Sequence, residues 1–176
     1  MQKNEFSPLR RLTMTALMAA LGTALAIMSK FLFGDLPVRI DLAVLPVLVV
    51  AYFLGPVESG IAYVLIDVLS SVFFYPPFLP ITLAKLVAGL YFGFLLKKCS
   101  PSPTRYAILF LVYAVLLDWL YMSFALYWLQ KTSIVAIMLL RAGQATIDVV
   151  VGFSFVYFVL PKLRSSMKSQ MRANRK

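Results

Sequence analysis

Charged residues inside otherwise apolar stretches constrain the fold of this chain more than any other feature. Asp67, Lys85, Asp118, Arg141 and Asp148 each lie within a long run of apolar residues. In the interior of a bilayer a charged side chain costs at least ~2.5 kcal/mol, so it normally faces a partner, a cavity or a ligand. We therefore expect an integral membrane protein that contains a polar pocket.

The composition argues against a water-soluble fold. Of the 176 residues 61% are hydrophobic and only 14% are charged, and the mean hydropathy is +0.87. Soluble domains carry about 25% charged residues. Six membrane spans of ~20 residues with short turns would use the whole chain. We therefore expect residues 1–176 to form one integral membrane domain, without room for a nucleotide-binding domain, so that any use of ATP depends on partner chains.

The apolar segments predict an all-α membrane protein, a bundle of six transmembrane helices. The expected spans cover about residues 11–33, 42–54, 57–74, 79–96, 106–129 and 134–160. The second span is short, contains Pro46 and ends at Gly55-Pro56, a strong turn signal, so we expect irregular backbone around it or burial against its neighbours. In the fourth span Gly89 and Gly93, four residues apart, suit close contact with another helix.

Basic residues are concentrated in alternate connections between the spans. Twelve lie near the N-terminus, in the 97–105 loop or in the 162–176 tail, and three lie in the other loops. Cytoplasmic loops of membrane proteins carry the excess of Lys and Arg. This bias predicts a cytoplasmic N-terminal segment (1–10), a basic cytoplasmic tail (162–176) and an even number of spans.

Several classes of chemistry have little support in the sequence. The chain has one cysteine, Cys99, and no histidine, which argues against zinc sites, Cys–His nucleophile pairs and haem ligation by histidine. No phosphate-binding glycine loop or clustered acidic motif is present. We expect no catalytic residue, no metal and no cofactor.

The charged residues of the later spans predict a pocket near the outer face. Arg141, Gln144 and Asp148 are spaced i, i+3 and i+7, so they share one helix face. Together with Lys85 and the aromatic residues Tyr121, Tyr127 and Trp128, this face would suit an anionic ligand with a flat ring, because Arg binds carboxylates through two hydrogen bonds and rings stack on aromatic side chains.

Two simpler interpretations stay open. The intramembrane charges can neutralise one another, for example Arg141 with Asp118 or with Asp148, and Tyr127 and Trp128 can be ordinary residues of the membrane–water interface. In the first span Ala16, Ala20 and Ala24 form a strip of small side chains that allows another helix to approach closely. Internal packing explains this strip as well as a partner protein does.

Motifs between residues 39 and 93 resemble those of a known family. In order, they are Arg39-Ile40-Asp41, Leu45-Pro46, Gly55-Pro56, Gly60, Asp67, Phe78-Leu79-Pro80-Ile81-Thr82 and Gly89-Leu90-Tyr91-Phe92-Gly93. This pattern, with the chain length and the alanine strip, resembles the substrate-binding S component of energy-coupling factor (ECF) vitamin transporters. The resemblance implies a multi-pass protein of the prokaryotic plasma membrane, which is a transport subunit rather than an enzyme.

The resemblance also implies partners and sites. An S component captures a vitamin outside the cell and docks on a module of one membrane coupling subunit and two ATPases, which hydrolyse ATP. By this likeness Ala16, Ala20 and Ala24 would meet the coupling subunit. The ligand site would be built by outer loops and spans four to six, and the candidate binding residues are Arg39, Tyr75, Phe78, Lys85, Tyr121, Trp128, Arg141 and Gln144.

The segment from Tyr75-Pro76-Pro77 to Pro80-Ile81-Thr82-Leu83 is most similar to folate-type members. Folate also fits the expected pocket chemistry, with a flat pterin, a benzoyl ring and a glutamate tail for which Arg39 is a candidate contact. Riboflavin and pantothenate remain alternative ligands. Two further hypotheses are a lipid-modifying membrane enzyme with a metal on Asp67, Asp118 and Asp148, and a carrier that works without an ATPase.

Overall fold

A computed structural model describes residues 7–33, 41–74, 78–98, 103–130 and 133–163. All of the described secondary structure is helical. The elements are α1 (Pro8–Phe33), α2 (Val44–Phe53), α3 (Pro56–Phe74), α4 (Leu79–Lys98), α5 (Pro103–Tyr113), the π-helix η1 (Ala114–Tyr121), α6 (Met122–Gln130), α7 (Ile134–Ser154) and the π-helix η2 (Phe155–Val159).

These elements form six helices, as predicted. The fifth is the continuous run of α5, η1 and α6, and the sixth is α7 with η2. Five of the six helices in the described chain are long and apolar enough to cross a membrane. The chain is therefore a multi-pass membrane protein with the predicted fold class. Most of the basic tail, Cys99 and the first residues of the N-terminal segment lie outside the described residues.

Helix α2 is the exception in length. Its 10 residues rise only ~15 Å, about half of the hydrocarbon thickness. Seven of them, from Val44 to Ala51, are buried by neighbouring helices, as the sequence predicted for this short span. The helix ends at the predicted turn, where Gly55 has a φ of 115°, a backbone conformation that side chains with a Cβ rarely adopt.

Helices α3 and α4 pack with their backbones in close contact. A Cβ atom placed on Gly89 would lie 2.6 Å from the Ser59 carbonyl oxygen, which leaves no room for a side chain. The Ser59 hydroxyl donates a hydrogen bond of 2.7 Å to the Gly89 carbonyl oxygen. The small residues of α4 therefore serve close helix contact, as their spacing predicted.

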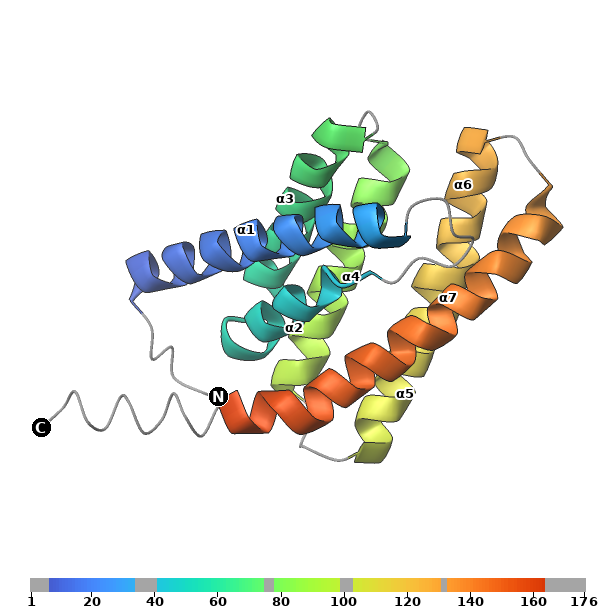
Figure 1. The fold of residues 1–176 in the computed structure, drawn as a ribbon. Helices are drawn as coiled ribbons and strands as arrows, with labels where there is room; N and C mark the ends of the chain where they lie inside the picture. The colour runs from blue at the N-terminus through green and yellow to red at the C-terminus, as the bar shows by residue number, and fades with distance from the viewer. Residues whose placement is uncertain (1–6, 34–40, 75–77, 99–102, 131–132, 164–176) are drawn as a thin grey trace, which may run out of the picture.

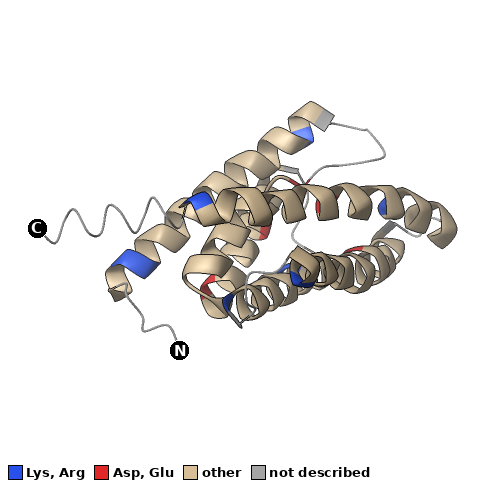
Figure 2. Ribbon diagram, turned by 90° about the horizontal axis from the view of Figure 1, so that it is seen from below, with Lys and Arg blue, Asp and Glu red and all other residues tan. Residues whose placement is uncertain are grey.

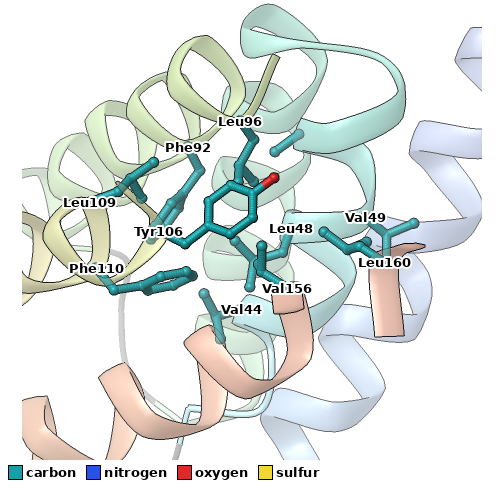
Figure 3. Close-up of a cluster of buried hydrophobic side chains, with 11 residues drawn as sticks. Val44, Leu48, Val49, Phe92, Leu96, Tyr106, Leu109, Phe110, Val156 and Leu160 are labelled. Carbon is teal, nitrogen blue, oxygen red and sulfur yellow. The ribbon is translucent and has the colours of Figure 1, made fainter. Parts of the chain in front are cut away.

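The helices form two groups that a buried cluster joins. Helix α1 crosses α2 and α3, with α4 behind them, whereas α5, η1, α6 and α7 lie to one side (Figure 1). Apolar side chains from α2, α4, α5 and the end of the sixth helix meet between the groups (Figure 3). Within this cluster the rings of Phe92 and Phe110 have centroids 5.4 Å apart, so aromatic packing holds α4 against α5.

Charged residues are sparse along the helices (Figure 2), and several of the described ones gather at two places. At the beginning of α1, Arg11 donates hydrogen bonds to the Glu58 carboxylate and to the Leu54 carbonyl oxygen. Lys97, near the end of α4, reaches the same carbonyl at 3.5 Å. The second gathering lies at the opposite ends of these helices, and it surrounds a cavity.

Candidate ligand cavity

A cavity of about 500 Å³ lies between the two groups of helices. It is lined by the last turns of α1, the second half of α3 and the beginning of α4, and from the other group by α5, η1, α6 and α7. Sites for small organic ligands typically have volumes of ~300–1,000 Å³ and combine apolar walls with a few polar groups. The volume and the lining of this cavity therefore match those of a binding site.

Lys85 of α4 is held by two side chains. Its ammonium group donates to the Asp41 carboxylate at 2.5 Å and to the Tyr63 hydroxyl at 3.0 Å. The Tyr63 hydroxyl in turn donates to Asp41 at 3.3 Å, and the ammonium lies 4.5 Å from the centre of the Tyr63 ring. This polar triad ties α3, α4 and the segment before α2 together at the cavity wall.

Asp41 has a structural role in addition to its ion pair. One carboxylate oxygen accepts a hydrogen bond of 3.1 Å from the Ala43 backbone amide at the beginning of α2. Burial raises the pKa of Asp41, but the attraction of Lys85 and the hydrogen bonds from Lys85, Ala43 and Tyr63 together lower it further, so that the pKa lies below its usual value. The side chain is therefore a carboxylate at neutral pH.

Arg141 of α7 pairs with Asp118 of η1 at the cavity wall. The guanidinium donates to Oδ1 of Asp118 at 3.4 Å, and Asp118 is only 7% exposed. About two turns further along α7, Asp148 accepts a hydrogen bond of 3.4 Å from the Asp41 backbone amide. This contact joins the segment before α2 to α7 and closes one side of the cavity.

The cavity is therefore not the cationic pocket that the sequence suggested. Lys85 and Arg141 are both paired with carboxylates, as in the alternative interpretation that the charges neutralise one another. Among the described lining residues the carboxylates are Asp41, Asp67, Asp118 and Asp148, and the basic side chains are Lys30, Lys85 and Arg141. The pairing has not closed the cavity, so charge neutralisation and an open cavity coexist.

Four of the candidate binding residues line the cavity: Phe78, Lys85, Arg141 and Gln144. Arg141, Gln144 and Asp148 all face it, as their i, i+3, i+7 spacing predicted. Arg39 and Tyr75 lie outside the described residues.

Tyr121 and Trp128 do not belong to the described lining. The Tyr121 hydroxyl donates a hydrogen bond of 3.1 Å to the Pro80 carbonyl oxygen, and Trp128 is 74% exposed. Their proposed contacts with the ligand remain predictions from the sequence. Tyr121 is the last residue of the π-helix η1, and Trp128 lies in α6, which follows it.

Sequence reasoning missed Tyr63, Tyr113 and Asp41 as parts of the cavity. Both tyrosines are in the lining, and they lie within apolar stretches where a tyrosine is an ordinary packing residue. The sequence put Asp41 in the connection between the first two spans. The helical spacing of residues cannot predict which helix a residue in a connection will contact. The sequence held one signal for Asp41: a lysine within an apolar span, Lys85, needs an acidic partner, a cavity or a ligand.

The alanine strip of α1 lies on the outside of the molecule. Ala16, Ala20 and Ala24 are exposed, whereas Ala19 and Gly22 on the same helix are buried against the bundle. Packing inside this chain therefore accounts for Ala19 and Gly22 but not for the strip.

Comparisons with known proteins relate this arrangement to one solved fold. No protein-family model matches the chain, and no curated protein sequence matches it. Among solved structures, the chain is similar to FolT in a crystal structure with folic acid bound, with a TM-score of 0.73 and 19% sequence identity over 86% of this chain and 92% of FolT. The chain thus shares the fold of FolT.

Proposed function

We propose that this protein is a folate-binding S component of an ECF-type importer. It captures the vitamin outside the cell and delivers it together with a separate coupling and ATPase module. The observation that carries the proposal is the cavity between the two groups of helices, which combines aromatic walls with paired charges in a chain with the fold of FolT, whose crystal structure holds folic acid.

The lining of the cavity supports a ligand with a flat, nitrogen-rich ring. Tyr113 and Phe78 offer aromatic surface on which a ring can stack. Carboxylates in the lining are hydrogen-bond acceptors, and the amino and N–H groups of a pterin are donors. The Lys85 ammonium of the same lining donates to two side chains and has a third N–H group for a carboxylate of the glutamate tail.

The surface of α1 supports the partner that this function requires. Ala16, Ala20 and Ala24 are exposed and are spaced by four residues, so they form a shallow strip to which the backbone of a helix can come close. In this proposal the strip binds the membrane coupling subunit, and two ATPases attached to that subunit supply the energy. The protein itself is a transport subunit in the plasma membrane of a prokaryote and catalyses no reaction.

A titration of the purified protein tests the ligand. We expect folic acid to bind tightly, with an affinity at least tenfold higher than that of riboflavin or pantothenate, measured by calorimetry in detergent. Lys85→Ala and Arg141→Ala should weaken binding, because each leaves a lining carboxylate without its partner. Tight binding of riboflavin with no response to folic acid would overturn the choice of vitamin, and no binding of any of the three would overturn the proposed class.

Reconstitution in liposomes tests the mode of transport. We expect folic acid uptake only when the coupling subunit and both ATPases are present with ATP. Uptake by this protein alone would identify a carrier and contradict the S-component proposal. The Lys85→Ala protein is the matched control for assembly, since it should lose ligand affinity but still co-purify with the module.

A further inference from the structure

Two buried oxygen atoms at the cavity lack hydrogen-bond partners among the described residues. They are Oδ2 of Asp118 and the Ser29 hydroxyl, which come from η1 and α1, and both residues line the cavity. A buried polar atom without a partner costs free energy, and most such atoms in folded proteins have one. The two exceptions lie in one cavity, which suggests that its occupant supplies the missing bonds.

Asp118 is placed to face such an occupant. It is only 7% exposed, and its Oδ1 accepts the hydrogen bond from Arg141 at 3.4 Å. This bond fixes one oxygen of the carboxylate and leaves the other for a second donor. Asp118 also lies inside the π-helix η1, and such segments occur frequently at functional sites.

The chemistry of this oxygen defines its partner. A carboxylate oxygen accepts hydrogen bonds and donates none, so the group that meets Oδ2 must be a donor. The donor must also belong to the part of the ligand that lies against the cavity wall formed by η1 and α7. A nitrogen heterocycle with an amino group or a ring N–H on one edge meets both conditions, whereas a carboxylate tail does not.

We propose that Asp118 determines the specificity of the cavity by accepting a hydrogen bond through Oδ2 from an N–H donor on the ring of the ligand. The inference rests on the proposed function and deepens it, because it assigns the ring, and not the acidic tail, to the end of the cavity formed by η1 and α7. Arg141 then binds Asp118 and holds its carboxylate, rather than gripping the tail itself.

Ligand analogues and an isosteric variant test this assignment together. Binding of folic acid is compared with that of two analogues, one in which the exocyclic amino group of the pterin is replaced by methyl and one in which the ring N–H is methylated. We expect at least one analogue to bind the unmodified protein roughly 10- to 100-fold more weakly than folic acid. Retained affinity for both analogues would overturn the inference without any substitution in the protein.

Asp118→Asn supplies the second arm. The amide has one acceptor oxygen in place of two, and its NH2 group would face a donor on Arg141 or on the ligand, so folic acid should bind roughly 10- to 100-fold more weakly. For the weaker analogue, the variant should cause little further loss, because the bond is already absent. Additive losses would show that Asp118 and the ring donor do not interact, and they would overturn the inference.

Glu58→Gln is the matched control. Glu58 is also the acidic partner of an arginine, Arg11, but it does not line the cavity, so the affinity for folic acid should stay within twofold. If the unmodified protein binds no folic acid, the proposed function and this inference both fail. If the unmodified protein binds folic acid and both analogues with equal affinity, only the inference fails.

Discussion

At the scale of single residues, the hydrogen-bonded triad of Lys85, Asp41 and Tyr63 dominates the cavity wall. Each of the three side chains contacts the other two. The side chains of Lys85 and Asp41 are 17% and 24% exposed, so water screens the pair only partly. In such pairs the loss of one partner costs more than the loss of both, because a lone charge stays behind in a poorly solvated site.

This asymmetry leads to a prediction for Lys85→Met. The substitution leaves the Asp41 carboxylate without its partner and should lower the free energy of unfolding by about 1–3 kcal/mol. Thermal unfolding of the purified protein in detergent measures the change. The double variant Asp41→Asn with Lys85→Met should recover most of the loss, since an amide still accepts the bond from Ala43. Equal destabilisation by the single and double variants would mean that the lone Asp41 carboxylate is not the cause of the loss.

A second prediction separates two aromatic residues that the sequence suggested for ligand stacking. Phe78 lines the cavity, whereas Trp128 is 74% exposed outside the described lining. Phe78→Ala should weaken folic acid binding by about tenfold, because it removes stacking surface. Trp128→Ala should change the affinity less than twofold in the same calorimetric titration. A large effect of Trp128→Ala would support the contact predicted from the sequence and would require this residue to reach the ligand.

The charged residues of the cavity lining that the sequence singled out share a physical property. Lys85, Arg141 and Asp118 are charged groups in apolar stretches, and the cost of such a charge in a bilayer requires a partner or a cavity. Gln144 followed from its spacing on the same helix as Arg141. Tyr63 and Tyr113 carry no such cost, since tyrosine is an ordinary residue of membrane helices. Only the fold shows that both residues line the cavity.

At the scale of elements, α1 carries two different faces. Ala26, Ser29 and Lys30 of its last turns line the cavity, whereas Ala16, Ala20 and Ala24 are exposed. One rigid helix thus connects the proposed docking strip with the proposed ligand site. In the S-component proposal, the strip is the part of α1 that binds the coupling subunit.

Ala16→Trp and Ala20→Trp test the docking strip. Each adds bulk where a partner helix would have to approach, so we expect loss of co-purification with the coupling subunit and loss of uptake. Folic acid binding to the isolated protein should stay unchanged. Leu139→Trp is the matched control, because it adds an aromatic ring at another exposed position, on α7. Normal assembly of both alanine variants would mean that this face does not bind the partner.

The contact between α3 and α4 gives a prediction about stability. Because a Cβ at Gly89 would lie 2.6 Å from the Ser59 carbonyl oxygen, Gly89→Val should force the helices apart and destabilise the fold by about 1–3 kcal/mol. Val87→Leu on the same helix adds bulk at an exposed position and should have little effect. The midpoint of thermal unfolding compares the two variants, and similar midpoints would contradict the close packing.

Most of the elements could be predicted from apolar stretches and turn residues. Gly55-Pro56 marked the turn between α2 and α3 because it combines a glycine at positive φ with a proline at the beginning of a helix. The π-helical segments could not be predicted in this way, since their side chains are as apolar as those of the flanking α-helices.

At the scale of the whole molecule, the bundle provides apolar surface to the membrane and a polar interior between two groups of helices. The buried cluster of α2, α4, α5 and the end of the sixth helix holds the groups together at one end (Figure 3). The cavity separates them at the other. A ligand that contacts both groups would stabilise the fold by binding only to the folded state.

Identification of the retained ligand tests the central claim most directly. The purified protein is incubated with an equimolar mixture of folic acid, riboflavin and pantothenate and separated from free ligand by gel filtration. The bound compound is then identified by mass spectrometry. We predict that folic acid is retained in an amount equimolar to the protein, and retention of riboflavin or pantothenate in its place, or of no vitamin at all, would contradict the account.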